Sequence, residues 1–249
     1  MRWFKAQFRA LGTTNLPGSL ELDGHRYELE QEFKHSFAAA VGLYRCGDDR
    51  IVVKFHRQKS FFGLPLGELG KLMAWYEATI MTRCDDLKGV PRLRGQPVPG
   101  SVAHDFVPGH PLHRDSKVDD RFFPRFLDLL ESLHDRGIAY VDLEKARNVL
   151  VGEDGRPYLI DFQVAYWIPD RLLGNTTVAR FIRNLLQEAD RYHAMKHFRR
   201  VRPDLLSGEE IAHARDKPRV VRFGNFLSQP YKKIKRFLLG KSQKSGEED

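Results

Sequence analysis

The sequence has few cysteines and no long apolar run. Its two cysteines, Cys46 and Cys84, lie far apart and neither belongs to a Cys-x-x-Cys pair, which argues against a zinc ribbon or a disulfide framework. No stretch approaches the roughly 18 consecutive apolar residues of a membrane-spanning helix. The first residues also lack the apolar core and cleavage site of a secretory signal. We therefore expect a protein that stays in the cytosol.

Acidic residues are scarce at both ends of the chain. The formal net charge is +8 over 249 residues. Residues 217–244 carry nine Lys and Arg and no acid, and residues 1–12 carry three basic residues and no acid. After the three acids at 247–249 are included, the two ends contribute +6 and +3, so residues 13–216 carry −1. A nearly neutral body is thus flanked by two basic segments.

The body has the pattern of an α+β fold. Residues 27–44 alternate in part with a period of two, residues 47–49 form a turn signal and residues 51–55 resume as a strand, which predicts a hairpin or meander. Two short strands are expected over residues 92–107. Helices are expected over residues 1–12, 66–83, 122–133 and 177–196, and Gly137 is expected to cap the third of them. A last helix is expected to begin near Ser207, which forms a capping box with Glu210.

Two of these helices have a defined apolar stripe. The first stripe consists of Leu69, Leu72, Met73, Tyr76 and Ile80, and the second of Phe181, Leu185, Ala189, Tyr192 and Met195. The two prolines of residues 106–111 predict an extended connector between lobes. The expected organisation is therefore a basic amphipathic segment (1–12), an N-lobe of sheet plus helix (13–107), a helical C-lobe (108–216) and a basic amphipathic tail (217–249).

Two carboxylates and a carboxamide lie at the ends of two short apolar strands in the middle of the chain. Residues 140–151 place Asp142 and Asn148 before a strand, and Asp161 follows the next strand. Oxygen ligands of this kind suit Mg²⁺, which takes one or two carboxylates and completes its shell with phosphate oxygens and water. Each residue taken singly has an ordinary structural explanation, but the ordered series favours an ATP-dependent phosphotransferase.

This series resembles the protein-kinase-like superfamily, in particular its small atypical members such as RIO-type kinases and bacterial lipopolysaccharide core (heptose or Kdo) kinases. The resemblance covers residues 27–170 and implies a two-lobed fold with ATP and Mg²⁺ as cofactors. Ile51-Val52-Val53-Lys54 matches the strand that carries the phosphate-binding lysine. The implied roles are phosphate contact for Lys54, its ion-pair partner for Glu77, acceptor orientation or deprotonation for Asp142, charge stabilisation for Lys145, and Mg²⁺ binding for Asn148 and Asp161.

The sequence departs from the family pattern at several points. Five residues rather than four separate Asp142 from Asn148, and Tyr140-Val141 replace His-Arg, which removes the arginine that commonly binds a phosphorylated activation segment. Gln163 replaces the glycine after Asp-Phe, and no Ala-Pro-Glu motif follows. Residues 34–42 contain no Gly-x-Gly-x-x-Gly, although Ser36 or Lys34 would supply a donor to phosphate and a plain surface turn explains the same letters.

The acceptor is expected to carry a hydroxyl group on a sugar, glycolipid or protein. Because few residues follow Asp161, a small molecule or glycolipid fits better than a broad range of proteins. Aromatic and aliphatic residues interleave with lysines in the basic tail, which suits an anionic membrane surface first, packing on the body second and nucleic acid third. The alternatives are a RIO-like protein serine/threonine kinase, associated with RNA, and a noncatalytic nucleotide-binding pseudokinase module.

Overall fold

The chain divides into two compact units. The computed structural model describes residues 8–60 and 65–208. Unit 1 comprises Met1–Pro108 together with Leu159–Val164, and unit 2 comprises Gly109–Tyr158 together with Ala165–Asp249. The segment around Asp161 therefore belongs to the same unit as Lys54, although more than a hundred residues separate the two in the sequence.

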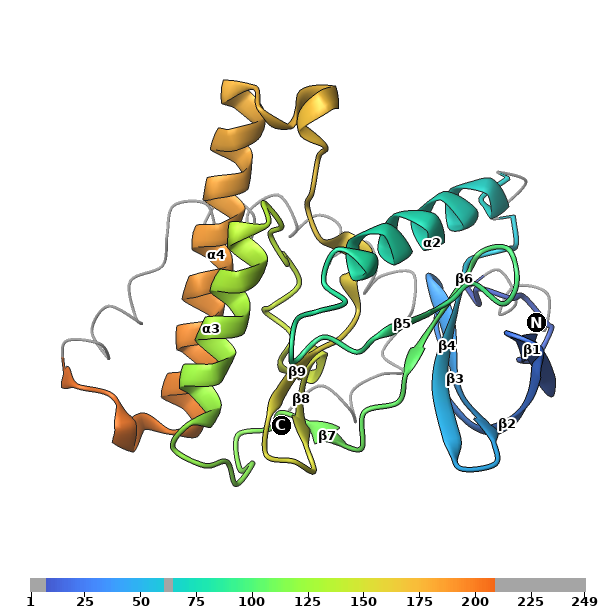
Figure 1. Ribbon diagram of the computed structural model, residues 1–249, viewed down its shortest axis with the longest axis horizontal. Helices are drawn as coiled ribbons and strands as arrows, with labels where there is room; N and C mark the ends of the chain where they lie inside the picture. The colour runs from blue at the N-terminus through green and yellow to red at the C-terminus, as the bar shows by residue number, and fades with distance from the viewer. Residues whose placement is uncertain (1–7, 61–64, 209–249) are drawn as a thin grey trace. The chain divides into compact units, whose positions relative to one another are not determined.

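Unit 1 is built on a six-stranded antiparallel sheet in the order β1-β2-β3-β4-β6-β5 (Figure 1). Its strands are β1 (Ser19–Leu22), β2 (His25–His35), β3 (Ala39–Cys46), β4 (Asp49–His56), β5 (Leu93–Gly95) and β6 (Ser101–Asp105). The predicted meander and the two short strands over residues 92–107 are confirmed.

The central strand β4 has two buried faces with different chemistry. Side chains alternate between the faces of a strand. On one face Ile51, Val53 and Phe55 belong to the main apolar cluster of the unit, which also contains Tyr27 and Tyr44. The other face carries Val52, Lys54 and His56, all buried. This alternation places a lysine and a histidine side by side inside the unit.

Helix α2 (Gly67–Thr82) covers this sheet and presents an unexpected face to it (Figure 1). The predicted helix is confirmed, but its predicted apolar stripe is buried only in part: Ile80 is buried, whereas Leu69 is 50% exposed and Leu72 57% exposed. The buried face combines three small residues, one acid and two large apolar residues: Gly70, Ala74, Glu77, Ala78, Ile80 and Met81. A Cβ at Gly70 would lie 1.9 Å from the carbonyl oxygen of Arg57, so close packing of backbone against backbone decides which face turns inward.

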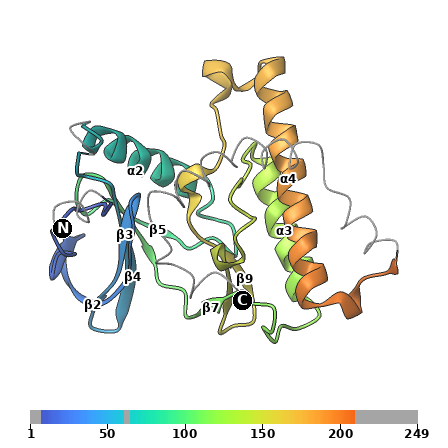
Figure 2. The ribbon, with the colours of Figure 1, turned by 180° about the vertical axis from the view of Figure 1, so that it is seen from behind.

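Unit 2 combines a small sheet with two long helices (Figure 2). The sheet has the order β7-β8-β9, with β7 (Gly109–Pro111), β8 (Val149–Gly152) and β9 (Pro157–Leu159). Helix α3 (Phe122–Asp135) packs on α4 (Thr177–Val201), where the rings of Phe123 and Phe198 stack with centroids 4.5 Å apart. The predicted helices are confirmed, as is the left-handed Gly137 (φ 71°) after α3.

The apolar stripe predicted for α4 is likewise buried only in part, with Tyr192 buried. Phe181 is 65% exposed, whereas Gln187, Asp190, His193 and His197 are buried. Three of these polar side chains are buried because they bond to the chain between α3 and Asn148. The spacing of apolar residues predicts the wrong buried face for a helix whose buried side chains are mostly polar and form hydrogen bonds.

The two ends of the chain and the connector predicted at residues 106–111 differ in part from the expected pattern. Residues 8–13 form turns and a bend rather than a helix, and residues 1–7 lie outside the described residues. The predicted connector contains strand β7, in which His110 is paired with Val151, because Pro111 stands at the end of the strand. Glu210 and the tail 217–249 lie outside the described residues, as does most of the helix expected after Ser207. No described helix has the length and hydropathy of a membrane span.

Candidate active site

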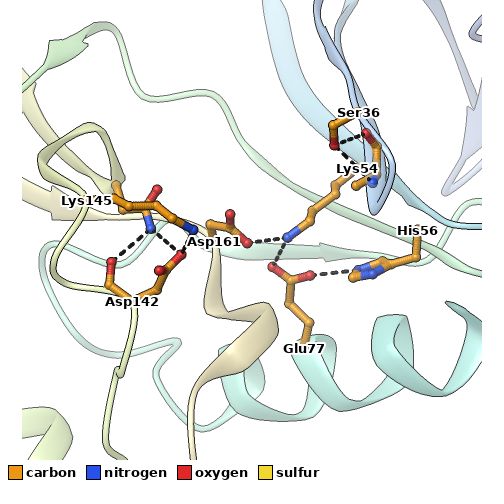
Figure 3. Close-up of polar contacts among 9 residues, drawn as sticks. Ser36, Lys54, His56, Glu77, Asp142, Lys145 and Asp161 are labelled. Carbon is orange, nitrogen blue, oxygen red and sulfur yellow. Dashed lines mark hydrogen bonds and ion pairs between the residues drawn. The ribbon is translucent and has the colours of Figure 1, made fainter. Parts of the chain in front are cut away.

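A buried lysine joins two carboxylates inside unit 1 (Figure 3). The Nζ atom of Lys54 donates to Oε1 of Glu77 at 3.0 Å and to Oδ1 of Asp161 at 2.5 Å. Lys54 is 8% exposed and Glu77 2% exposed, while the side chain of Asp161 is 36% exposed. The sequence prediction that Glu77 is the partner of Lys54 matches this geometry, and Asp161 joins the same cluster.

The charges of this cluster hold one another in the ionised state. Burial alone would lower the pKa of Lys54, but the negative charges of Glu77 and Asp161 outweigh it and raise that pKa above its ordinary value. Burial alone would raise the pKa of Glu77, but the Lys54 charge and a hydrogen bond from His56 lower it. The lysine therefore stays a cation in a place shielded from water, which strengthens its attraction for an anion.

His56 is a member of the cluster that sequence reasoning missed. Its Nε2 atom lies 2.7 Å from Oε2 of Glu77, and the residue is 1% exposed (Figure 3). Because an ionised carboxylate only accepts hydrogen bonds, Nε2 is the donor. Glu77 thus has one oxygen bonded to His56 and the other to Lys54, which fixes the carboxylate plane. The signal in the sequence was the spacing Lys54-x-His56, which puts both side chains on one face of β4.

The backbone around Asp161 is held in an uncommon conformation. Asp161 has φ 66°, in the left-handed region that non-glycine residues seldom occupy. The neighbouring Leu159 donates its N–H to the carbonyl oxygen of Gly89 at 2.8 Å, and Phe162 is fully buried in the short helix η2 (Phe162–Val164). These contacts aim the Asp161 carboxylate at Lys54 although Gln163 stands where the family has glycine.

Unit 2 brings together the three polar residues of the loop before β8. Asp142 Oδ2 accepts from Lys145 Nζ at 2.6 Å and from Asn148 Nδ2 at 3.0 Å, and Asn148 Nδ2 also lies 3.2 Å from the carbonyl oxygen of Asp142. Figure 3 shows Lys145 reaching back to Asp142. The loop contains the short helix η1 (Ala146–Asn148), and Asn148 is buried.

Helix α4 anchors this loop through Asp190, which sequence reasoning also missed. Asp190 is 1% exposed, and its carboxylate accepts the backbone N–H of Tyr140 at 2.7 Å and of Val141 at 2.8 Å. Nε2 of His134 lies 3.3 Å from the same carboxylate. Val141 has φ 72°, a strained value for a β-branched residue. The two hydrogen bonds hold that strained residue directly before Asp142.

Two further side chains of α4 support the same region. The side-chain amide of Gln187 donates to the carbonyl oxygens of His134 and Ile138 at 3.0 and 3.3 Å. Nε2 of His197 lies 2.7 Å from the carbonyl oxygen of Leu143, and burial lowers the pKa of His197 to about 4. A neutral His197 with its proton on Nε2 satisfies that carbonyl. The polar face of α4 is thus a scaffold for the Asp142 loop.

The expected phosphate-covering loop is a tight turn between β2 and β3. The hydroxyl of Ser36 donates to the carbonyl oxygen of Ala39 at 3.0 Å, and the backbone N–H of Ser36 donates to the same oxygen at 2.9 Å. The guanidinium of Arg57 lies 4.2 Å from the ring centroid of Phe37 and donates to its carbonyl oxygen at 3.0 Å. The Ser36 hydroxyl is therefore committed to the turn, and a bond from it to phosphate would replace an existing one.

The predicted metal ligands have suitable donor chemistry. Asn148 turns its nitrogen to Asp142, so its carbonyl oxygen is the end left for a cation. Asp161 is a carboxylate, one oxygen of which accepts from Lys54. Among the described residues, no group of three or more His, Cys, Asp or Glu is arranged to hold a metal by itself. Each residue taken by itself carries an oxygen of the kind that Mg²⁺ prefers.

Comparison with known proteins supports the fold. No protein-family model and no curated protein sequence matches the chain. The Rio2 kinase of Chaetomium thermophilum, solved as an ADP/Mg²⁺-phosphoaspartate complex, superposes with a TM-score of 0.52 at 15% identity, covering 75% of this chain and 61% of the Rio2 chain. A second structure of that kinase gives 0.52 and 15%, covering 70% and 58%. The chain has a protein-kinase-like fold. The matched part spans about three fifths of the Rio2 chain.

The predicted α+β class is confirmed by the antiparallel sheet with helix α2 in unit 1 and the two long helices of unit 2. At 15% identity the likeness concerns the fold alone. Neither of the two similar structures is a lipopolysaccharide core kinase. The activity and the acceptor must therefore be inferred from the chemistry of this chain's own side chains.

Proposed function

We propose that the protein is an ATP- and Mg²⁺-dependent phosphotransferase that acts on a hydroxyl group. The observation that carries this proposal is the buried cation of Lys54, held by Glu77 and Asp161 at 3.0 and 2.5 Å. A buried ion pair contributes little to stability compared with apolar packing, so its cost is better explained by a ligand. A triphosphate is an anion that such a lysine binds, and the Rio2 neighbour was solved with ADP/Mg²⁺.

Each polar residue has a role in the proposed reaction. Lys54 would contact the phosphates of the nucleotide, and Asn148 and Asp161 would hold Mg²⁺, which would supply positive charge to the phosphate oxygens. Asp142 orients the acceptor hydroxyl and takes its proton. A bond forms between the acceptor oxygen and the γ-phosphorus while the bond to the β-phosphate oxygen breaks, releasing ADP. Lys145, 2.6 Å from Asp142, stabilises charge on the transferred group.

For the acceptor, we propose a lipopolysaccharide-type sugar or another glycolipid at the inner membrane surface. Only residues 165–176 separate η2 from α4, and part of that segment forms the short helix η3 (Asp170–Gly174), so little chain is present there to hold an extended peptide. A serine or threonine hydroxyl of a protein, as in a RIO-like protein kinase, fits the same chemistry. The basic ends, of which residues 1–7 and 217–249 lie outside the described residues, would attract an anionic membrane before nucleic acid.

A comparison of two lysine variants tests nucleotide binding. Lys54→Met removes the buried cation, whereas Lys71→Met removes an exposed lysine of α2 that pairs with Glu68 at 2.7 Å. We expect the thermal shift caused by ATP with Mg²⁺ to disappear in Lys54→Met and to persist in Lys71→Met. An unchanged shift in Lys54→Met would refute the assignment of the phosphate contact.

Transfer is tested separately from binding. Asp161→Ala should abolish ATP turnover while the protein stays folded, and full activity in that variant would contradict the assigned metal ligand. Incubation with ATP and extracted glycolipids, and in parallel with protein substrates, identifies the acceptor by a mass gain of one phosphoryl group. Phosphorylation of proteins alone would favour the protein-kinase alternative.

A noncatalytic nucleotide-binding module is the second candidate. The turn at Ser36 favours it, because that hydroxyl and its backbone N–H are both used within the turn. The joint presence of Lys54, Asp142 and Asp161 opposes it. A Mg²⁺-dependent thermal shift without turnover on any acceptor would select this second candidate.

A further inference from the structure

An exposed apolar surface lies at one end of unit 2. It consists of five large side chains from η3 and the first turns of α4, which we call the tip: Leu172 (68% exposed), Leu173 (63%), Val178 (68%), Phe181 (65%) and Ile182 (39%). The last three fall at positions i, i+3 and i+4 of the helix and therefore share one face. Both ribbon views show η3 and the start of α4 extending past the end of α3 (Figures 1 and 2).

Hydrogen bonds hold the tip in a defined conformation. Thr176 caps α4, because its Oγ1 accepts the N–H of Ala179 at 3.2 Å. The same hydroxyl donates to the carbonyl oxygen of Leu173 at 2.7 Å, and the N–H of Thr176 donates to that oxygen at 3.0 Å. Thr176 thereby ties the leucines of η3 to the first turn of the helix, so the five apolar side chains are presented together.

The charge around the tip is net positive. From residue 170 to residue 187 the sequence has three arginines, Arg171, Arg180 and Arg183, and one acid, Asp170. Neither Arg180 nor Arg183 forms an ion pair with an acid among the described residues. The next acid on α4 is Glu188, seven residues after Phe181 and so about 10 Å along the axis. An apolar projection with unpaired arginines at its base is complementary to an anionic lipid surface.

A second exposed apolar face in the molecule shows why the charge matters. Leu69, Leu72 and Trp75 of α2 are 50 to 57% exposed at positions i, i+3 and i+6. Beside them Glu68 and Lys71 form an ion pair at 2.7 Å, so this face has no excess of positive charge. Apolar exposure is similar on both faces, but only the tip among these two combines it with unpaired cations.

We propose that the tip is the surface through which the protein docks on an anionic lipid bilayer. The apolar side chains enter the interface between headgroups and acyl chains, and Arg180 and Arg183 remain at the level of the lipid phosphates. This proposal requires no catalysis. Its consequence for the acceptor rests on the proposed function: Asp190, which anchors the Asp142 loop, lies nine residues after Phe181, roughly 14 Å along α4. That separation suits a hydroxyl on the headgroup of a membrane-bound glycolipid.

Sedimentation with vesicles tests the docking surface. The full chain is mixed with vesicles of phosphatidylcholine alone or with phosphatidylglycerol added. We expect binding to the anionic vesicles to fall at least tenfold in Phe181→Ser with Ile182→Ser, about fivefold in Arg180→Gln, and less than twofold in the matched control Leu69→Ser with Leu72→Ser. High salt should weaken the binding of the parent protein. Equal binding of the tip variant and the parent would overturn the proposal, as would a failure of the parent to bind.

A fluorescence measurement distinguishes insertion of the tip from binding through another part of the chain. Phe181→Trp places a reporter on the tip, and brominated lipids quench tryptophan that enters the acyl region. We expect stronger quenching in this variant than in the parent. A variant that sediments with vesicles but whose added tryptophan is not quenched would show that residues 217–249 or another segment makes the contact, and would overturn the proposal. Equal urea midpoints of tip variant and parent exclude unfolding.

Discussion

Asp190 should be among the side chains whose loss destabilises unit 2 most. Its carboxylate is 1% exposed and accepts two backbone N–H groups, those of Tyr140 and Val141, at 2.7 and 2.8 Å. Asp190→Ala removes both acceptors and leaves these two backbone donors, together with Nε2 of His134, without their partner in a place that water reaches poorly. A buried donor without a partner costs about 1–3 kcal/mol, so two of them cost about 2–6 kcal/mol.

Relaxation of the loop offsets part of that cost. Val141 has φ 72°, and its return to an ordinary conformation would recover roughly 1–2 kcal/mol. The expected net loss in the free energy of unfolding is therefore about 3 kcal/mol, a large share of the 5–15 kcal/mol typical of a domain. Asp190→Asn should lose less, because its carbonyl oxygen still accepts one N–H while its amide nitrogen faces the other.

Urea unfolding measures this loss. A change of about 3 kcal/mol lowers the midpoint by about 1 M or more for a typical dependence on urea. Asp128→Ala is the matched control, since Asp128 is exposed on α3 and should change stability by no more than about 0.5 kcal/mol. Hydrogen exchange of the amides of Tyr140 and Val141 reports the same two bonds locally. If Asp190→Ala unfolds within about 1 kcal/mol of the parent and both amides stay protected, the anchoring role assigned to Asp190 is wrong.

Three further predictions concern the buried ionisable groups. Lys54→Met should lower stability by about 3 kcal/mol because Glu77 keeps a buried charge without its cation, and adding Glu77→Gln should recover most of the loss; urea midpoints of the two variants decide this. His56→Phe should cost about 1–3 kcal/mol, since Oε2 of Glu77 loses its donor, whereas His56→Gln should cost less; equal midpoints for the two would contradict the role of the hydrogen bond. Burial lowers the pKa of His197 from 6.5 to about 4. The neutral imidazole therefore contributes about 3 kcal/mol to the free energy of unfolding above pH 6.5, and this contribution is lost as the pH falls toward 4. The parent should therefore lose stability between pH 6.5 and pH 4 more steeply than His197→Gln, which retains a donor for the carbonyl oxygen of Leu143, and parallel pH profiles of the urea midpoint would exclude this assignment.

Local pattern alone was sufficient for most of the secondary structure, although not for the turns of residues 8–13 or for β7. The meander, α2, α3 and α4 follow from alternation, apolar spacing and turn residues that act over a few positions. The pairing of Lys54 with Glu77 follows instead from the resemblance of the ordered series to the kinase pattern, and the fold of the chain agrees with that resemblance.

The orientation of two helices was beyond the reach of local pattern. Apolar periodicity assigns Leu72 and Phe181 to the interior, yet they are 57% and 65% exposed. In α2 the inward face is set by the close approach of Gly70 to the backbone of Arg57, and in α4 it is set by bonds from Asp190 to the loop before Asp142. Both causes are contacts between residues far apart in the chain, and the spacing of apolar residues along a single helix carries no information about them.

The amino-acid sequence by itself determined the order of the strands and helices, the neutral body between basic ends, and the residue types available for phosphate chemistry. Tertiary structure alone decided that His56 bonds to Glu77, that Asp190 holds a strained Val141 before Asp142, and that Phe181 projects with its apolar neighbours at an end of unit 2. The physical reason is range: propensity and periodicity act within a few residues, whereas a buried polar group is stable only where a distant segment supplies its partner.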